Sequence, residues 1–266
     1  MAFKLGDLVI DRIIEGVAEN SRGELLYMLT NLQEATISVT ADSVDAVDGT
    51  GTIIKTFYRG KQGEFTATNS TISLPIIGAM SGSDPVYASA ASPLTIPRIV
   101  TADKASGIAL PGITDAGTSN HIVVNAVGAN GTLGDAYPVA KYTVTAGVDG
   151  NPSTLTIDAN AGDTMFIIKY DRTVTENGIK IANRSDRFPK SVKLTLKVLI
   201  VDPCETDVVR AAYVVLPSFQ PSPEVEISFS TDATLDFTGR LQTSYCGTEK
   251  VLYEIYVCSD DQEDYA

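Results

Sequence analysis

One run in the last third of the chain alternates strictly between apolar and polar residues, and it constrains the fold more than any other feature. Its apolar members are Val192, Leu194, Leu196, Val198 and Ile200. Lys193, Thr195 and Lys197 stand between them. A period of two places the apolar side chains on one face of a long β-strand and the polar ones on the other. The sequence therefore predicts a sheet with one buried and one solvated face.

The same period appears earlier in the chain and again near its end. Ala35, Ile37 and Val39 alternate with threonine and serine, which predicts a half-buried strand. Residues 41–63 contain Asp-Gly and Gly turn signals around Ile53, Ile54, Phe57 and Tyr58, and we expect a long hairpin or loop there.

Two further strands are expected towards the C-terminus. In residues 224–229, Val225, Ile227 and Phe229 alternate with Glu224, Glu226 and Ser228. Residues 251–257 are rich in aromatic and β-branched residues and predict a final strand.

Two segments favour helix. In residues 7–19 the apolar positions recur at roughly helical spacing, which predicts a short amphipathic helix or arm. Asn69, Ser70 or Thr71 is expected to cap a second short helix that runs to Met80, with Pro75 in its first turn. A strand over residues 72–77 is the alternative for that second segment.

Residues 81–165 have a different texture, because small residues and Gly, Pro and Ser turns dominate. Strands are expected near 120–127, 139–146 and 153–158. We therefore predict a mainly β protein with three parts: residues 1–80, an inserted β module or set of elaborated loops at 81–165, and residues 166–266.

Charge and hydropathy exclude several classes of protein. A formal net charge of −13 argues against a sustained grip on nucleic acid, which needs clustered Lys and Arg. No segment has the ~18 consecutive apolar residues of a membrane span, and the first residues lack the apolar core of a secretory signal. We expect a protein made and folded in the cytoplasm, with Cys204, Cys246 and Cys258 reduced.

The residues that carry chemistry are sparse. His121 is the only histidine, so two-histidine metal sites are excluded. Asp42, Asp45 and Asp48 do not have the alternate-residue spacing of a calcium loop. No nucleophile elbow, phosphate loop or dinucleotide fingerprint occurs. We expect no catalytic, cofactor or metal site, and a protein that is not an enzyme.

Three segments, residues 25–74, 191–241 and 250–261, together resemble bacteriophage tail tube (major tail) proteins. The first has a strand, a long loop with a Lys- and Arg-bearing return strand, and a Thr-Asn-rich approach to a short helix. The second includes the runs AAYVVLP and EVEISF, and the third is KVLYEIYVCSDD. The middle of the chain, residues 81–165, departs from the simplest tube proteins and resembles an added module that decorates the outer surface.

The resemblance implies a β-sandwich or half-barrel with a flanking helix. It implies subunits that join edge to edge in hexameric rings, with a continuous inner β-barrel, and rings that stack into a tube. The implied partners are further copies of the chain and other tail proteins: a sheath if the tail is contractile, a tape measure, a terminator and a baseplate. DNA would pass through without lasting contact, no membrane would be involved, and the protein would be located in the virion tail after assembly in the host cytoplasm.

The resemblance also directs attention to two groups of residues. The acids that we expect to line the lumen and repel phosphate are Glu224, Glu226, Asp232 and Asp236. Lys193 and Lys197 also lie on a polar strand face, so which face points inward stays open. The residues expected to contact the next ring lie within 42–63 and are Asp45, Thr52, Phe57, Tyr58 and Arg59. The alternative is an ordinary hairpin that packs its own aromatics.

Two other functions fit parts of this profile. A capsid decoration or head-tail joining protein would be equally β-rich and acidic, but would form oligomers that never stack into tubes. A carbohydrate-binding or adhesin module is disfavoured, since the chain has no Trp and no secretion signal.

Overall fold

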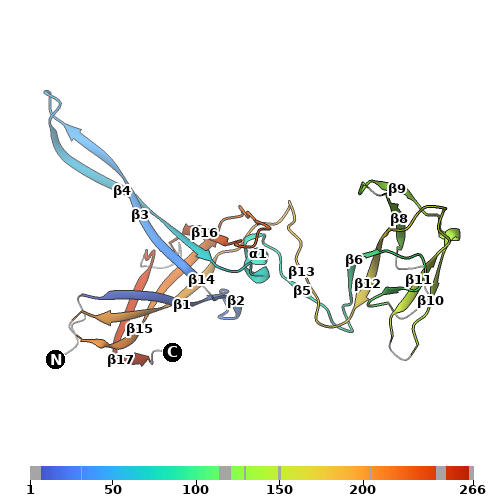
Figure 1. Ribbon diagram of the computed structural model, residues 1–266. Coiled ribbons are helices and arrows are strands. Elements are labelled where there is room, and N and C mark those ends of the chain that lie inside the picture. The colour runs from blue at the N-terminus through green and yellow to red at the C-terminus, as the bar shows by residue number, and fades with distance from the viewer. Residues whose placement is uncertain are drawn as a thin grey trace. The chain divides into compact units, whose positions relative to one another are not determined.

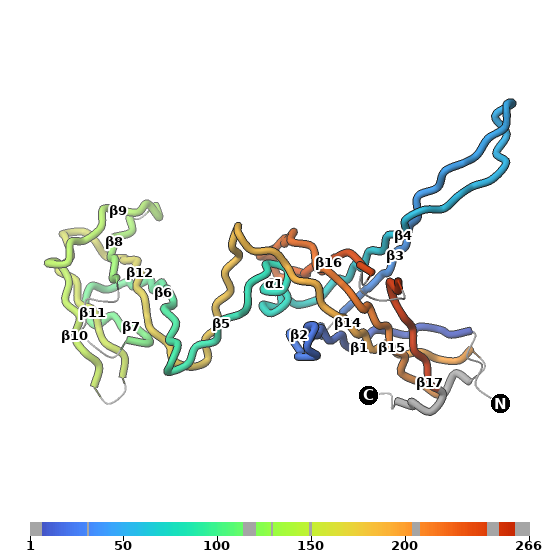
Figure 2. The backbone as a smooth tube through the Cα atoms, turned by 180° about the vertical axis from the view of Figure 1, so that it is seen from behind, coloured from blue at the N-terminus to red at the C-terminus, as the bar shows by residue number. Residues whose placement is uncertain are grey.

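The computed structural model describes residues 7–30, 32–113, 121–128, 130–148, 151–203, 205–243 and 250–263, except for the side chains of 205–207 and 259–263. The chain divides into two compact units (Figures 1 and 2). Unit 1 comprises Met1–Pro85 and Ile181–Ala266, and unit 2 comprises Val86–Lys180. The prediction that residues 1–80, 81–165 and 166–266 are separate parts of the protein stays a prediction.

Unit 1 is built on one antiparallel sheet of eight strands. They are β1 (Val9–Glu19), β2 (Leu25–Thr30), β3 (Leu32–Val47), β4 (Ile53–Asn69), β14 (Val192–Asp202), β15 (Glu205–Pro221), β16 (Leu235–Leu241) and β17 (Glu254–Glu263). Their order is β2-β1-β14-β15-β16-β4-β3, and β17 pairs with β15. The mainly β prediction is confirmed.

The alternating run at 192–200 forms β14, as predicted. Its apolar residues are buried in the core of unit 1. Lys193 is exposed on the opposite face, and its Nζ lies 3.5 Å from the carboxylate of Glu19. The prediction for residues 251–257 is confirmed in part, because β17 begins at Glu254.

The sheet of unit 1 bends over its own core. Tyr27 of β2 packs edge to face on Phe237 of β16, with ring centroids 6.1 Å apart, although these strands lie far apart in the strand order. Phe65 and Phe219 complete an aromatic cluster with Phe237. The described strands do not close into a barrel, so the fold is sandwich-like.

The short helix is confirmed in type and end. It is α1 (Leu74–Met80), with Pro75 in its first turn, and it buries Ile76, Ile77 and Met80. Its N-cap is Ser73, later than the predicted caps, because the chain up to Asn69 still belongs to β4. The strand alternative over 72–77 is wrong.

The predicted N-terminal helix at residues 7–19 is wrong, because this segment is β1, paired with both β14 and β2. Two β-bulges explain the error. The register with β14 shifts between Ile10 and Arg12 and again between Ile13 and Glu15. Each bulge adds one residue and breaks the period of two, so apolar spacings of three appear and imitate a helix.

The predicted strand at residues 224–229 is also wrong for the isolated chain. These residues join β15 to β16 and form no ladder with a described strand. Val225 is half-buried against the core of unit 1, whereas Ile227 and Phe229 are exposed. Alternation specifies two faces for a strand, but it does not supply a partner.

Unit 2 contains the remaining described elements. They are β5 (Val86–Tyr87), β6 (Leu94–Ala102), β7 (Ile108–Leu110), β8 (Val123–Val127), β9 (Leu133–Ala136), η2 (Val139–Lys141), β10 (Tyr142–Thr145), β11 (Ser153–Ile157), β12 (Phe166–Val174) and β13 (Ile179–Lys180). The sheets have the orders β6-β12-β8-β9, β10-β11-β7 and β13-β5. The strands predicted near 120–127, 139–146 and 153–158 correspond to β8, β10 and β11. Phe166, Ile168 and Tyr170 of β12 are buried at the centre of this unit.

Candidate assembly surfaces

The most unusual feature of unit 1 is the distal half of the β3–β4 hairpin, residues 40–62, which we call the arm (Figure 1). From Gly63 to Asn69, β4 has β16 on one side and β3 on the other. Between residues 42 and 59 the two strands of the arm pair only with each other among the described strands. Both outer edges therefore present free backbone donors and acceptors.

A glycine bulge marks the base of the arm. Asp42 is opposite Arg59 and Ala41 is opposite Lys61, so Gly60 is the extra residue. Gly60 has φ 58°, in the left-handed region that glycine adopts without steric cost. Bulges of this type bend and twist the strand that carries them.

The tip of the arm is a turn organised by one carboxylate. Asp48 Oδ1 accepts hydrogen bonds from the backbone N–H groups of Thr50 and Thr52, both at 2.9 Å, and from Thr50 Oγ1 at 2.6 Å. The Thr50 hydroxyl, followed by the backbone N–H groups of Thr52 and Thr50, lowers the pKa of Asp48 below its usual value. Asp48 is therefore part of a defined turn at the tip.

The two faces of the arm differ in chemistry. One carries the cross-strand pairs Asp42/Arg59, Val44/Phe57 and Ala46/Lys55. The other carries Ser43/Tyr58, Asp45/Thr56 and Val47/Ile53. Lys55 Nζ lies 5.4 Å from the centroid of the Phe57 ring. Thr56 Oγ1 donates a 2.6 Å hydrogen bond to Asp45.

The residues predicted to contact the next ring are thus distributed around the arm. Phe57 and Arg59 lie on one face, Asp45 and Tyr58 on the other, and Thr52 at the tip turn. Tyr58 is 75% exposed, and Phe57 is exposed as well. The two aromatics point to opposite faces, so the hairpin does not bury them against each other. Their role in stacking stays a prediction.

A second surface is the solvated face of β3, β4 and β16, which we call the threonine face. It is formed by Glu34, Thr36, Ser38, Glu64, Thr66, Thr68, Asp236, Thr238 and Arg240, which are cross-strand neighbours. Thr68 Oγ1 donates a 3.0 Å hydrogen bond to Asp236. The opposite face of these strands carries Phe65, Ala67 and Phe237 and belongs to the core.

The four acids predicted to line a lumen do not share one strand face. Asp236 lies on the threonine face, where the fold brings it together with Glu34 and Glu64, which the sequence reasoning missed. The signal for those two acids was their alternation with threonine and serine in β3 and β4. Glu224, Glu226 and Asp232 are exposed in the connection before β16. Which acids line a lumen stays a prediction.

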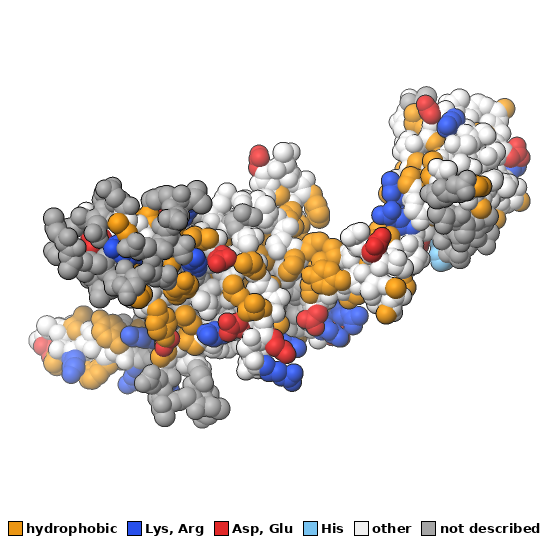
Figure 3. All heavy atoms as spheres, turned by 90° about the horizontal axis from the view of Figure 1, so that it is seen from below, with side chains coloured by type: hydrophobic (Ala, Val, Ile, Leu, Met, Phe, Trp, Pro, Cys, Tyr) orange, Lys and Arg blue, Asp and Glu red, His pale blue; other side chains and the backbone are white. Residues whose placement is uncertain are grey.

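Charge is not segregated on the face drawn in Figure 3. Acidic and basic side chains are interspersed there among hydrophobic ones, so the net charge of −13 does not form one continuous acidic patch on that face. Any electrostatic guidance of a polyanion therefore depends on which surface it meets.

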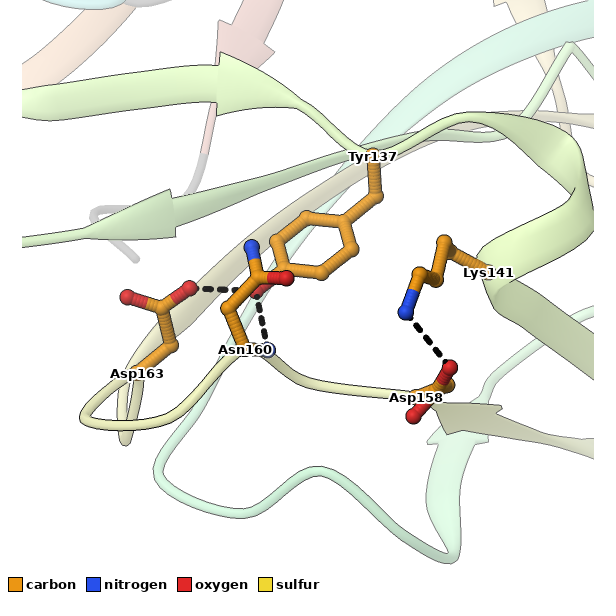
Figure 4. A network of polar contacts seen from close by, with 5 residues as sticks. All are labelled: Tyr137, Lys141, Asp158, Asn160 and Asp163. Atoms are coloured by element: carbon orange, nitrogen blue, oxygen red, sulfur yellow. Dashed lines mark hydrogen bonds and ion pairs between the residues drawn. The ribbon is translucent and has the colours of Figure 1, made fainter.

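Unit 2 contains a polar network that fastens a loop (Figure 4). The Tyr137 hydroxyl donates a hydrogen bond to Asp163 and accepts one from the backbone N–H of Asn160 at 3.0 Å. Burial of the phenol, followed by the hydrogen bond to Asp163, raises the pKa of Tyr137. Lys141 forms a 2.7 Å ion pair with Asp158 beside it. These contacts hold the loop after β11 to Tyr137 and Lys141, so their role is structural.

Other reactive groups are isolated where the structure describes them. His121 Nδ1 lies 3.6 Å from Asp171 on an exposed surface. Cys258 is exposed and unpaired, while Cys204 and Cys246 lie outside the described residues. No group of three or more His, Cys, Asp or Glu within the described ranges is arranged to hold a metal ion. In the same part of the chain, no helix has the length and apolar character to cross a bilayer.

Comparison with known proteins places this architecture in a family. No individual curated protein matches the chain. The family model described as the YomU/Tube protein family matches residues 9–250, which include every strand of unit 1 except β17, all of unit 2 and the arm. This match confirms the resemblance to phage tail tube proteins that residues 25–74 and 191–241 indicate. The chain belongs to the YomU/Tube protein family.

Proposed function

We propose that this protein is the subunit of a bacteriophage tail tube, and that it closes into hexameric rings which stack to form a conduit for DNA. The observation that carries the proposal is the arm. An isolated two-stranded hairpin is marginally stable in water, yet the arm exposes Ile53, Ile54, Phe57 and Tyr58 together with two free strand edges. A second copy of the chain that covers these groups would remove an aggregation hazard and gain apolar burial.

The threonine face is our choice for the wall of the conduit. Threonine and serine hydroxyls are neutral, and Glu34, Glu64 and Asp236 repel phosphate. Arg240 is the one basic residue among the nine that define this face. Too few cations are present to release many counterions from DNA, so a duplex would slide along this wall without being held.

The remaining parts of the proposal follow from the same role. Other tail proteins, such as a tape measure, a terminator, a baseplate and, in a contractile tail, a sheath, would contact the assembled tube. The protein would occupy the virion tail after assembly in the host cytoplasm. A structural subunit of this kind needs no catalytic residues and no cofactor.

Negative-stain electron microscopy of the purified full-length protein over a concentration series tests the proposal. We expect hollow tubes or stacked rings. A matched variant replaces residues 42–59 by an Asn-Gly turn, which retains the strand pairing below the bulge. It should form rings that do not stack.

Each alternative outcome has a meaning. Closed oligomers of the wild-type chain that never stack would favour a capsid decoration or head-tail joining protein. If the shortened-arm variant forms tubes like the wild type, the arm is not needed for stacking. A wild-type protein that stays monomeric at every concentration would contradict the proposal.

A further inference from the structure

Residues 223–229, which we call the connecting segment, have the alternation of a strand but no strand beside them. Their backbone groups make no hydrogen bond to the backbone of a described residue, and the Glu224 N–H donates to the Ser222 hydroxyl at 3.3 Å. On either side, the Ser222 N–H donates to the Thr238 carbonyl and the Ala233 N–H donates to the Ser230 carbonyl. Phe229 is 93% exposed, and Ile227 is exposed as well. A solvated loop does not require alternating apolar residues, so this pattern points to a partner outside the chain.

The connecting segment and the arm lie at opposite ends of the same strand pair. Where β16 meets β4, Leu241 is opposite Gly63, and beyond Gly63 the chain continues into the arm. At the other end, Leu235 is opposite Asn69, and the chain before Leu235 leads back to the connecting segment. The connecting segment begins beside Thr238, midway along β16, and leads towards the Leu235 end, whereas the arm begins at the Leu241 end.

Stacked rings repeat head to tail, so one end of a subunit contacts the opposite end of a subunit in the next ring. An arm that leaves one end of unit 1 must then meet the surface at the other end. This step rests on the proposed function. The connecting segment is the exposed, unpaired, apolar feature at that end.

We propose that the connecting segment of one subunit adds as an antiparallel β-strand to the free edge of β4 in the arm of a subunit in the adjacent ring. With Glu226 opposite Phe57, Glu224 is opposite Arg59 and Ser228 is opposite Lys55. On the other face, Ile227 lies opposite Thr56 and Phe229 reaches Ile53 and Ile54, while Val225 lies opposite Tyr58 and keeps its contact with the core of its own unit 1. The Glu224–Arg59 pair matches in charge and the contact of Phe229 with Ile53 and Ile54 matches in apolar character, and main-chain hydrogen bonds hold the added strand.

Charge selects the β4 edge of the arm over its β3 edge. The distal part of β3 carries Asp42 and Asp45, which would oppose the acids of the connecting segment. The distal part of β4 carries Lys55 and Arg59, which attract them. Like charges directly opposite each other destabilise a strand pair, whereas opposite charges stabilise it.

The first test removes the apolar anchor. Phe229→Ser should raise the protein concentration needed for stacking by about tenfold or more, because a large aromatic side chain that is buried in a contact is a typical hot spot, while ring formation stays unchanged. Ser228→Pro should have the same effect, since proline removes a ladder donor and leaves both apolar side chains in place. Phe188→Ser is the matched control, because Phe188 is a 68% exposed phenylalanine of unit 1 outside the segment.

The second test exchanges charges. Arg59→Glu and Glu224→Arg should each weaken stacking. The double variant should restore it, because the two charges are then exchanged and each contact between rings again pairs opposite charges. Tube length in electron micrographs and the pelleted fraction in sedimentation measure stacking. Light scattering after gel filtration gives the molar mass of the oligomer and so measures ring formation.

Three results would overturn the inference. If the Phe229→Ser variant forms tubes like the wild type, the connecting segment does not take part in the contact between rings. A double charge variant no better than either single variant would reject the Arg59–Glu224 pairing. Loss of rings as well as tubes in Phe229→Ser would assign the segment to contacts within a ring. If the shortened arm abolishes stacking while Phe229→Ser does not, the proposed function stands and this inference fails.

Discussion

At the scale of single residues, Tyr27 brings into the core of unit 1 a hydroxyl that the fold does not use. Tyr27 Oη is buried without a hydrogen-bond partner in the described part of the chain, while its ring packs on Phe237. Burial raises the pKa of the Tyr27 phenol well above its usual value. The ring therefore contributes apolar packing, and the hydroxyl contributes a desolvation cost.

Tyr27→Phe should leave the free energy of unfolding unchanged or raise it by up to about 1 kcal/mol, because a buried unsatisfied hydroxyl is removed. Since the folded-state pKa is raised, the folded protein retains the proton, and wild-type stability falls as the pH rises above about 10, the pKa of an unfolded tyrosine. Denaturant titrations at neutral pH and at about pH 11 measure both effects. The variant should lose less stability between the two pH values. Tyr58→Phe, which changes an exposed tyrosine, should lose as much stability as the wild type. If Tyr27→Phe also lost as much as the wild type, the role assigned to the buried Tyr27 hydroxyl would be contradicted.

The hydroxyl of Tyr137 presents the opposite case, since it is fully bonded. Tyr137→Phe should destabilise unit 2 by about 1 to 2 kcal/mol, because Asp163 and the Asn160 amide lose their partner. Hydrogen exchange of the amides around residues 158–165 would show the loss locally. Tyr87→Phe is the control, as Tyr87 is an exposed tyrosine of the same unit. Unchanged exchange in Tyr137→Phe would mean that the loop is held by other contacts.

At the scale of elements, sequence patterns predicted regular strands and failed where the ladder is irregular. The run at 192–200 was predicted as β14 because its own alternation is unbroken: at the register shift between Val192 and Leu194, the extra residue lies on β15. Residues 7–19 were misread because bulges at Asp11 and Ile14 altered the spacing. Residues 224–229 have the pattern of a strand without a ladder, and no sequence pattern specifies the partner of a strand. The exposed loop around Phe57 was located correctly, whereas Glu34 and Glu64 became visible as neighbours of Asp236 only through the register of β3, β4 and β16.

The turn at the tip of the arm supports a prediction about pH. The folded-state pKa of Asp48 is lowered, so its hydrogen bonds stabilise the turn above the pKa of an unfolded aspartate, about 3.9, and are lost as the pH falls through the lower folded value. Amide exchange of Thr50 and Thr52 should therefore accelerate below about pH 4, after correction for the intrinsic rate. Asp48→Asn should show fast exchange at neutral pH as well. Asp42→Asn is the control, and equal exchange in both variants would contradict the role of Asp48.

At the scale of the whole molecule, the threonine face gives the proposed conduit its electrostatic character. Glu64→Lys and Asp236→Lys each change the charge of one subunit by +2 on the same face. Tubes of the double variant should retain DNA at low salt and release it as salt rises, because lysines in a confined wall release counterions from phosphate. Nuclease protection of DNA inside purified tubes measures retention.

The matched control for this prediction carries the same charge change elsewhere. Asp135→Lys changes an exposed residue of β9 in unit 2. Combined with Asp103→Lys, which changes another exposed residue of unit 2, it gives the same net charge as the double variant of the threonine face. Equal retention in both would mean that total charge, and not the identity of the wall, decides how DNA behaves.

The chain enters and leaves unit 2 through adjacent residues, since Val86 pairs with Lys180 and Tyr87 with Ile179. Unit 2 is therefore attached to the rest of the chain through two neighbouring strands. Its loss leaves a gap that a short turn can bridge, and its replacement requires only another domain whose ends lie equally close. A lineage could thus gain, lose or exchange this domain by a single recombination event without disturbing the rest of the fold. An engineer could use the same junction to display an enzyme or an epitope once per subunit along the proposed tube.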